Sequence, residues 1–494
     1  MDIAALFSEL FSLSTLFFIA LGTFVGLIIG ALPGLGTMFA IVMLLPITYV
    51  ISPLDSVLLL LAAYQASEYG GSISSIILGI PGTPAAAATV LDGYTLAKNE
   101  SPGKAITYSL IASTIGGIFG GIVLIFLSKP LASFGLKLSD PEFFLICILG
   151  VLAVGMLSSE DKTKSLISVV FGLILGTIGM DVFTGKMRFT LGFLELSDGI
   201  NIVALMIGVF AFSEILSMLE EGPDKRHSFD KRSLKFGITW KEFSGVKKPI
   251  SLGSLIGSVV GVFPGLGAPA ASWFGYVAAK RFSKKKELFG KGNPEGIAGP
   301  ESANNATVGG SLVPLLSLGI PGSPAVAVIM GAFIIHGIQP GPLVFSNETT
   351  LVYSILYGFL LTTVAMYVLG RMLTVFFVKA IIVPYSYLVP IVLLLLIMGV
   401  YASKQLIFEI SLAFVLGVIC YFLKKLDFSL PSIVMAFVLG PIMEESLRRS
   451  LSLSQGSYAI FFTRPYSLAL VIIIAVIVLV SLVKKLGPSK HVSS

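Results

Sequence analysis

Long stretches of the sequence contain no Asp, Glu, Lys or Arg. The longest are residues 10–54 and 302–347, and shorter ones occupy residues 105–128, 380–403 and 465–483. Each reaches the length of about 20 residues that a helix needs to cross the hydrocarbon core of a bilayer. Lipid leaves backbone groups without water, so only helices or closed barrels can span it. Barrel strands would alternate apolar and polar residues, and these stretches do not. The sequence therefore predicts an all-α polytopic membrane protein.

The composition supports this class. Of 494 residues, 12% are charged, which is about half the share of a soluble domain, and 55% are apolar. Cys147 and Cys420 lie in apolar stretches, and the three histidines are not clustered. The sequence therefore predicts no disulfide and no cofactor, and it leaves the ligands of any metal ion unknown. The net charge of +6 suits cytoplasmic loops beside anionic lipid and predicts no nucleic-acid partner. Because the N-terminus lacks a basic region, we expect the first apolar segment to be a retained helix.

Two polar segments are rich in basic residues. Residues 220–250 carry Lys225, Arg226, Lys231, Arg232, Lys235, Lys241, Lys247 and Lys248, and residues 280–301 carry six more. The positive-inside rule places both segments in the cytoplasm. Between them, Pro264-Gly265-Leu266-Gly267 divides residues 251–279 into arms of about 12 residues, or about 18 Å of helix, which is too short to cross a core of about 30 Å. We therefore predict a re-entrant helical hairpin here.

The chain repeats an ordered set of motifs. GALPGLG at residues 30–36 matches GVFPGLG at 261–267, and GIPGTPA at 79–85 matches GIPGSPA at 319–325. GGS at residues 70–72 likewise matches 309–311. Three matches in the same order indicate a duplication.

The duplication divides the chain into three parts. We predict a first transmembrane repeat over residues 1–221, a basic cytoplasmic linker over 222–250, and a second repeat with C-terminal helices over 251–494. Further helices are predicted near residues 105–128, 142–157, 165–181, 201–218, 350–370, 386–403, 406–423, 430–443 and 465–483. The short segments 142–157 and 430–443 leave the number of crossings open. We favour inverted over parallel repeats.

The paired interruptions are the candidate binding site. Interrupted helices at corresponding positions of two repeats mark the binding site in many secondary transporters. A helix N-terminus offers free N–H groups to a carboxylate, and freed carbonyl groups can hold Na⁺. The candidate substrate-binding residues are Pro33, Gly34, Leu35, Gly36, Thr37, Gly82, Thr83, Gly265, Leu266, Gly267, Gly322, Ser323, Asn304 and Asn305.

Structural explanations compete with this interpretation. Gly and Pro are common in membrane helices as plain kinks or at close helix crossings. The hydroxyl groups of Thr83 and Ser323 could cap the following half-helices, and Asn304 and Asn305 could form interhelical hydrogen bonds. We favour a ligand role for these residues because they recur in matched positions or lie beside them.

Ionisable residues near the interruptions are further candidates. Glu68, Asp92, Glu301 and Glu348 flank the predicted hairpins, and ionisable groups in a membrane are functional candidates by default. Glu68 could relay a proton, complete a cation site or lie at the interface. For His336 we favour a structural role. The sequence shows no Ser/His/Asp arrangement, no HExxH and no GxxxxGK[ST], so we do not predict an enzyme.

The motifs resemble those of the large membrane subunit of the bacterial tripartite tricarboxylate transporter family. The blocks that carry the resemblance are residues 30–36, 69–91 (YGGSISSIILGIPGTPAAAATVL), 261–276 (GVFPGLGAPAASWFGY), 289–306 (FGKGNPEGIAGPESANNA), 318–323 and 337–342 (GIQPGP). The resemblance implies uptake of organic carboxylates, such as citrate-like di- and tricarboxylates, driven by a Na⁺ or H⁺ gradient. It also implies an elevator-like movement of the hairpins, a small membrane subunit and a periplasmic solute-binding protein as partners.

We therefore expect the translocating subunit of an ion-driven carboxylate importer, a multi-pass protein of the bacterial inner membrane. A channel or a permease for another small solute would use similar broken helices. A membrane-embedded enzyme would need clustered acid and base groups, and a membrane scaffold would not need four matched interruptions. These alternatives stay open at this stage.

Overall fold

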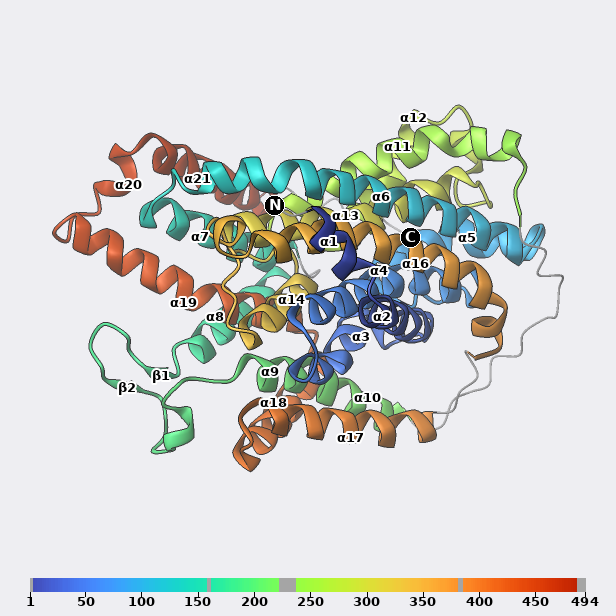
Figure 1. Ribbon diagram of the computed structural model, residues 1–494. Helices are drawn as coiled ribbons and strands as arrows, with labels where there is room; N and C mark the ends of the chain where they lie inside the picture. Colours follow the sequence, from blue (N-terminus) through green and yellow to red (C-terminus); the bar gives the residue numbers. More distant parts are fainter. Residues whose placement is uncertain (1–2, 158–160, 222–236, 381–384, 487–494) are drawn as a thin grey trace.

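The computed structural model describes residues 3–157, 161–221, 237–380 and 385–486 of the chain (Figure 1). Within these residues, six helices are long and apolar enough to cross a membrane: Leu13–Ala31, Pro102–Gly135, Ile202–Glu220, Thr349–Leu373, Ile407–Lys425 and Leu430–Leu453. The predicted helical membrane class is therefore confirmed. Most of the predicted linker, residues 222–236, lies outside the described residues.

The centre of the fold is a set of long helices. These are α2 (Leu13–Ala31), α4 (Pro53–Leu78), α6 (Pro102–Gly135), α11 (Trp240–Val262), α13 (Glu295–Leu318) and α16 (Thr349–Ala380). Shorter helices α1 (Ile3–Leu10), α3 (Gly36–Leu44), α5 (Ala87–Asn99), α12 (Gly267–Phe282), α14 (Pro324–Ile335) and α15 (Val344–Asn347) connect them. Nearly every residue of α4 and α13 is buried, so these two helices form the middle of the molecule.

Glycines bring α2 against α4 and α11 against α13. Gly22, Gly26 and Gly30 of α2 face the carbonyl groups of Leu59, Ala63 and Ser67, and Gly253, Gly257 and Gly261 of α11 face those of Gly299, Ala303 and Thr307. A Cβ atom at any of these glycines would lie only 2.1–2.7 Å from the carbonyl oxygen. The backbones can approach this closely only because the side chains are absent. In both pairs the residue numbers increase together, so the two helices of each pair are parallel.

The outer helices cross between the two halves of the chain. Gly116 and Gly120 of α6 pack on Ser302 and Ala306 of α13, whereas Gly358 and Gly370 of α16 pack on Leu58 and Tyr69 of α4. Both of these pairs are parallel, but α6 and α16 are antiparallel, because Gly121 meets Phe359 and Gly370 meets Leu110. It follows that α4 and α13 run in opposite directions.

The turns that break the helices have matched backbone conformations. Gly34 and Gly36 after α2 have φ of +93° and +69°, and Gly265 and Gly267 after α11 have φ of +91° and +66°. Gly79 and Gly319 end α4 and α13 with φ of +72° and +74°. Side chains disfavour this left-handed region, so glycine is required at these positions.

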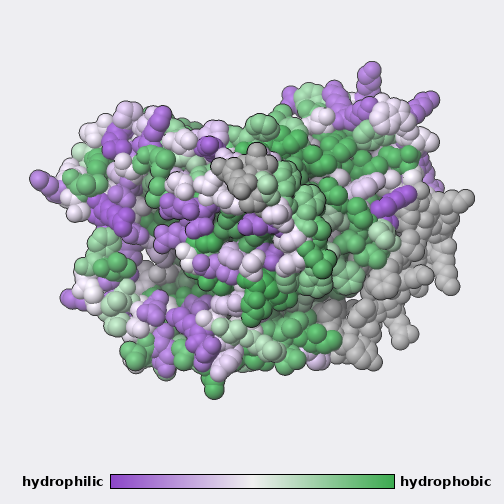
Figure 2. Space-filling view, in the orientation of Figure 1, coloured by the Kyte–Doolittle hydropathy of each residue, from purple (hydrophilic) through white to green (hydrophobic). Residues whose placement is uncertain are grey.

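A peripheral set of helices surrounds the centre. It contains α7 (Asp140–Leu157), α8 (Lys162–Gly176), α9 (Ile202–Met206), α10 (Ser213–Glu221), α17 (Tyr385–Lys404), α18 (Ile407–Lys425), α19 (Leu430–Leu453), α20 (Ile460–Thr463) and α21 (Pro465–Leu486). The two-residue strands β1 (Gly179–Met180) and β2 (Met187–Arg188) pair as a hairpin at the left edge of Figure 1. Figure 2 shows apolar side chains over much of the centre-right of this face and hydrophilic ones towards the left edge. An apolar surface of this kind suits contact with lipid.

Several predicted boundaries were wrong. The helices predicted over residues 105–128 and 350–370 continue to Gly135 and Ala380, and three further boundaries have a clear physical cause. The helix predicted over residues 165–181 ends at Gly176, because Gly179 adopts φ +123° and Asp181 accepts the N–H groups of Phe183 and Thr184 in a turn. The helix predicted over 430–443 continues to Leu453, where ion pairs one turn apart support it. These polar residues keep the helix intact although the apolar pattern ends.

The third boundary changes the hairpin. Helix α11 begins at Trp240, inside the segment predicted as linker, and not near residue 251. A capping box between Thr239 and Glu242 starts it there. The predicted length of about 12 residues for the first arm was therefore wrong, because α11 has 23 residues, or about 35 Å of helix. The predicted interruption at residues 263–266 is present.

Candidate functional site

The helix breaks of each half pack against one another. In the first half, the Gly82 N–H donates to the Gly71 carbonyl at 3.2 Å, and a Cβ atom at Gly82 would lie 2.1 Å from the Gly30 carbonyl oxygen. In the second half, the Gly265 N–H donates to the Gly322 carbonyl at 3.1 Å. The turn after α2 thus meets the turn after α4, and the turn after α11 meets the turn after α13. The predicted residues Gly82, Gly265 and Gly322 lie at these contacts between turns.

Polar side chains join the two halves at the same place. The Tyr64 and Ser323 hydroxyl groups lie 3.3 Å apart, and the Asn304 amide donates to the Glu68 carbonyl at 3.3 Å. The Thr83 hydroxyl donates to the Glu68 carboxyl at 3.5 Å. All five residues are buried. The structure thus brings the predicted residues Thr83, Asn304 and Ser323 together on one face of α4, and we call these five residues the central cluster.

The turn between α2 and α3 lies open beside the central cluster. No atom lies within 4 Å of the Cβ position of Gly34, whereas Leu35 and Thr37 are buried and Pro33 and Gly36 are partly buried. Thr37 lies next to the Glu68 side chain. The corresponding turn in the second half is covered, because the Cβ position of Gly265 lies 2.6 Å from Val154 of α7. Leu266 is partly buried there and Gly267 is buried. The two matched turns therefore differ in access.

Helix N-termini also gather at the breaks. Helices α3, α12 and α14 begin at Gly36, Gly267 and Pro324, directly after the interruptions. The Ser323 hydroxyl accepts the Val326 N–H and so caps α14, whereas Thr83 forms no capping bond. First-turn N–H groups without helical partners can hold an anion. The arrangement can therefore bind carboxylate groups near buried side-chain oxygen atoms.

Asn305 does not join the central cluster. Its amide nitrogen donates to the sulfur of Met366 on α16 at 3.2 Å. The side-chain oxygen atoms of Asn304 and Asn305 are buried without a hydrogen-bond partner. Adjacent residues of a helix point about 100° apart, which explains why only Asn304 reaches Glu68.

The other ionisable candidates have separate surroundings. The Asp92 carboxyl accepts the Tyr276 hydroxyl and the N–H groups of Gly290, Gly292 and Asn293, so it anchors the loop before α13. His336 lies 2.9 Å from the Ser56 hydroxyl, and Glu348 is exposed between α15 and α16. Cys147 and Cys420 are free and buried.

Two sets of residues were not predicted: Tyr64, and the hydroxyl residues around the predicted candidate Glu301. Tyr64 precedes Glu68 by one helical turn, and this polar pair in an apolar helix is the pattern that could have indicated it. Glu301 accepts hydrogen bonds from Thr89 of α5 and from Ser109 and Ser113 of α6. Ser109 and Ser113 also lie one turn apart, but nothing in the sequence relates α6 to α13.

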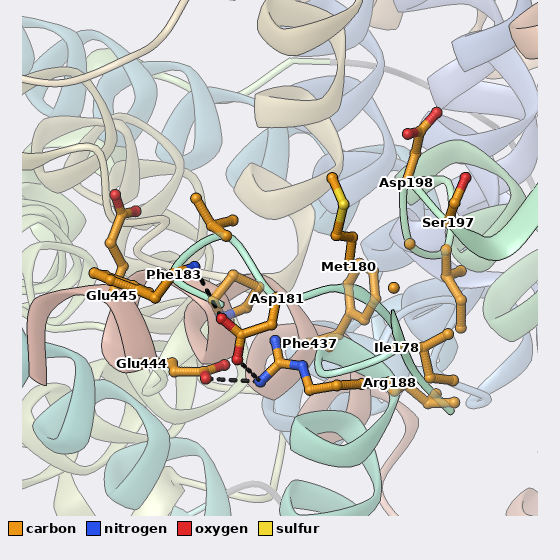
Figure 3. A pocket seen from close by; sticks show the side chains of 17 residues that line it. Ile178, Met180, Asp181, Phe183, Arg188, Ser197, Asp198, Phe437, Glu444 and Glu445 are labelled. Atoms are coloured by element: carbon orange, nitrogen blue, oxygen red, sulfur yellow. Dashed lines mark hydrogen bonds and ion pairs between the residues drawn. The ribbon is translucent and has the colours of Figure 1, made fainter. Parts of the chain in front are cut away.

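A cavity of about 410 Å³ lies away from the central cluster, between α8, the β-hairpin and α19 (Figure 3). Arg188 lies 2.7 Å from Glu444 and 3.6 Å from Asp181, and Arg448 lies 2.9 Å from Asp181. Burial opposes ionisation of Asp181, but the N–H groups of Phe183 and Thr184 and the Arg448 guanidinium hold its pKa below the usual range. The arginine charges here are matched by carboxylates, so the cavity presents no unpaired basic group of this network to an anion.

Comparison with known proteins identifies the family. The family described as "Tripartite tricarboxylate transporter TctA family" matches residues 16–435. The chain belongs to this family. The TctA family is a transporter family, and its transporter is tripartite, so the chain is a membrane transport component that works with partner subunits. This confirms the resemblance found in the motifs.

Two relatives come from Agrobacterium vitis. An uncharacterized 52.8 kDa protein in the TAR-I ttuC′ 3′ region is 37% identical over 449 residues, which are 91% of this chain and 89% of the relative. An uncharacterized protein in the TAR-II ttuC′ 3′ region is 38% identical over 214 residues, which are 43% of this chain and 88% of the relative. No solved structure matches the chain. Both relatives are uncharacterized, so their names indicate no substrate.

Proposed function

We propose that this chain is the translocating subunit of an ion-driven importer of organic carboxylates, and that the helix breaks around the central cluster bind the substrate. The observation that carries this proposal is the meeting of four helix breaks with a buried polar cluster. First-turn N–H groups of α3, α12 and α14 supply partial positive charge for carboxylates. Citrate-like di- and tricarboxylates fit such a site because several carboxylate groups can meet several helix N-termini.

A coupled cation completes the charge balance. Glu68 lies at the centre of the cluster, and its side-chain neighbours are the Thr83 and Thr37 hydroxyl groups and the Asn304 amide, not basic side chains. A bound anion beside Glu68 would add like charge at low dielectric, which is costly. Na⁺ or H⁺ bound together with the substrate would offset that charge, which favours symport. The free Asn304 oxygen is available as a ligand.

The paired contacts support two inverted repeats. The glycine contacts of α2 with α4 recur between α11 and α13, at separations of 231 residues for the first helix and 240 for the second. The offset of 240 residues between the contacts of α4 and α13 differs by one from the offset of 239 residues between the two GGS motifs. Because α4 and α13 are antiparallel, the two hairpins enter from opposite sides. We assign the first repeat to residues 1–221, the linker to 222–239 and the second repeat, which begins with α11, to 240–494.

Inverted hairpins suit an elevator-like movement in the inner membrane. The basic ends of the α11–α12 hairpin, with Lys247, Lys248, Lys280 and Arg281, belong in the cytoplasm by the positive-inside rule. One crossing earlier, the β-hairpin then faces the periplasm. A periplasmic solute-binding protein and a small membrane subunit are the proposed partners, in keeping with a tripartite transporter. The centre would move against the peripheral helices.

The experiment compares Gly34→Val with Gly185→Val. Both glycines have positive φ, +93° and +67°, and open space at Cβ, so the substitutions impose the same backbone strain at different places. We expect Gly34→Val to abolish uptake of labelled carboxylate with normal insertion, and Gly185→Val, in the β-hairpin, to retain it. Equal uptake by both variants would remove the α2–α3 turn from the site. A channel would instead give uptake that does not saturate with substrate.

A further inference from the structure

A second buried carboxyl group lies apart from the proposed substrate contacts. Glu301 of α13 is fully buried and precedes Asn304 by one helical turn. Its carboxyl accepts the hydroxyl groups of Thr89 at 2.5 Å, Ser113 at 2.9 Å and Ser109 at 3.1 Å. The Ser109 hydroxyl lies 2.5 Å from that of Ser72 on α4. We call Glu301 and these four hydroxyl residues the Glu301 shell, which joins α4, α5, α6 and α13.

Most buried carboxylates in the described residues have a source of positive charge. Glu142 pairs with Arg464, Asp181 with Arg448, and Glu409 lies 3.8 Å from Lys404. Asp92 accepts three backbone N–H groups, and Asp55 lies in the first turn of α4, where the helix N-terminus stabilises an anion. Among the buried carboxyl groups in the described residues, Glu68 and Glu301 lie in helix interiors, beside hydroxyl groups and without an ion pair.

The charges around Glu301 increase the cost of ionising it. The carboxyl group that acts on it from α4 is Glu68, which has the same sign. The other charged groups on the neighbouring helices already have partners. Asp92 of α5 accepts hydrogen bonds from the loop before α13 and from the Tyr276 hydroxyl of α12. Lys104 of α6 pairs with Glu100 and with Glu242 of α11. An ionised carboxylate buried without a counter-charge is expensive, and such a group neutralises instead.

The spacing of the oxygen atoms favours a proton over a metal ion. Each hydroxyl oxygen of the Glu301 shell lies 2.5–3.1 Å from its partner, which is the distance of a direct hydrogen bond. The shell is therefore closed by hydrogen bonds and has no gap between its oxygen atoms for a cation. Hydroxyl groups both donate and accept, so the pair of Ser72 and Ser109 can pass a proton towards Glu301.

We propose that Glu301 binds the proton that is coupled to substrate movement. The hydroxyl groups of Thr89, Ser109 and Ser113 donate to the carboxylate, and one of them rotates to accept from the acid when Glu301 is protonated. One proton from water adds to the carboxylate and removes its charge. In that state the Glu301 shell carries no net charge, and after release it contains an uncompensated carboxylate. The proposal rests on the proposed transport function and identifies its coupling ion as H⁺.

The first test reads protonation directly. Infrared spectra of the purified full-length chain are compared for the unsubstituted protein, Glu301→Gln and the exposed-site control Glu348→Gln. We expect a protonated-carboxyl C=O band that Glu348→Gln retains and Glu301→Gln loses, and that disappears as the pH rises. The same band intensity in all three proteins would overturn the proposal, whether or not the chain transports carboxylates.

The second test measures how a proton gradient affects citrate uptake into proteoliposomes that contain the chain with its partner subunits. An inward proton gradient should accelerate citrate uptake by the unsubstituted chain, and Glu301→Gln should lose this acceleration while retaining citrate exchange. Acceleration by a Na⁺ gradient alone, unchanged in Glu301→Gln, would overturn the assignment of the proton. Absence of any carboxylate uptake by the unsubstituted chain would contradict the proposed function, and the infrared comparison would still decide whether Glu301 holds a proton.

Discussion

The carboxylates at the centre of the molecule and those at its periphery are held in different ways. Peripheral Asp181 and Glu142 are paired with arginines, although both are buried. Central Glu68 and Glu301 are also buried, yet their side-chain neighbours are hydroxyl and amide groups and not arginines. A buried carboxylate with a cation is compensated and is destabilising only if its partner is lost, whereas an unpaired buried carboxyl is costly and is kept where ions bind. The contrast fits the proposal that the periphery is a support and that ions and substrate move through the centre.

The largest expected effect comes from separating the central helices. Gly257→Ala would place a Cβ atom 2.1 Å from the Ala303 carbonyl oxygen, so α11 must move away from α13. We expect a loss of about 3 kcal/mol in the free energy of unfolding, measured by denaturation in detergent. Gly245, on the exposed end of the same helix, has no atom within 4 Å of its Cβ position. Gly245→Ala should instead stabilise by about 0.5–1 kcal/mol, and equal losses in both variants would contradict the packing account.

The next effect tests the paired periphery. Arg464→Ala leaves the fully buried Glu142 carboxylate without its cation, which lies 2.8 Å away. We expect destabilisation of about 2 kcal/mol, seen as a lower thermal unfolding temperature. The control Arg449→Ala removes an exposed pair with Glu445 and should change stability by less than about 0.5 kcal/mol. If the two variants unfold alike, the peripheral pair does not hold α7 to α21.

Neutralising one carboxylate in each region sharpens the comparison. Asp181→Asn removes the partner of two arginines, so its unfolding temperature should fall. Glu68→Gln removes a charge that has no cation, so its unfolding temperature should stay the same or rise while carboxylate uptake falls. Thermal unfolding and uptake measured on both variants check this opposition. A large loss of stability in Glu68→Gln with normal uptake would reverse the roles of the two regions.

The smallest effect is a pH dependence at the N-terminal end of α11. Lys104, 2.8 Å away, and the Thr239 backbone and hydroxyl groups lower the pKa of Glu242 from 4.5 to about 2. A lowered pKa in the folded state stabilises the fold above the unfolded value and loses that contribution as the pH falls towards the folded value. The stability difference between the unsubstituted chain and Glu242→Gln, below about 1 kcal/mol at neutral pH, should therefore shrink as the pH falls from 4.5 to about 2. A difference independent of pH would show that the capping box does not depend on charge.

The sequence predicts the helical class and the positions of the breaks because both depend on local chemistry. Absence of charge over about 20 residues requires a membrane helix, and the Pro-Gly pairs stop helices where the structure places Gly34 and Gly265 at positive φ. The start of α11 was missed because the capping box at Thr239 lies in a polar segment that resembles a loop.

The central cluster is only partly predictable for a different reason. Thr83, Ser323 and Asn304 were predicted from matched motifs and local polarity, and the structure brings them together. The Glu301 shell depends on packing of α6 against α13, which are far apart in the sequence. Asn304 and Asn305 looked equivalent as neighbours, but helix geometry points Asn305 towards Met366.

Uptake of labelled citrate and a panel of dicarboxylates tests the central claim most directly. The chain is expressed with its small membrane subunit and binding protein, with and without an imposed Na⁺ or H⁺ gradient. The account predicts saturable, gradient-dependent uptake that disappears when this chain is omitted. Correct insertion of the chain with no uptake of any carboxylate would contradict it.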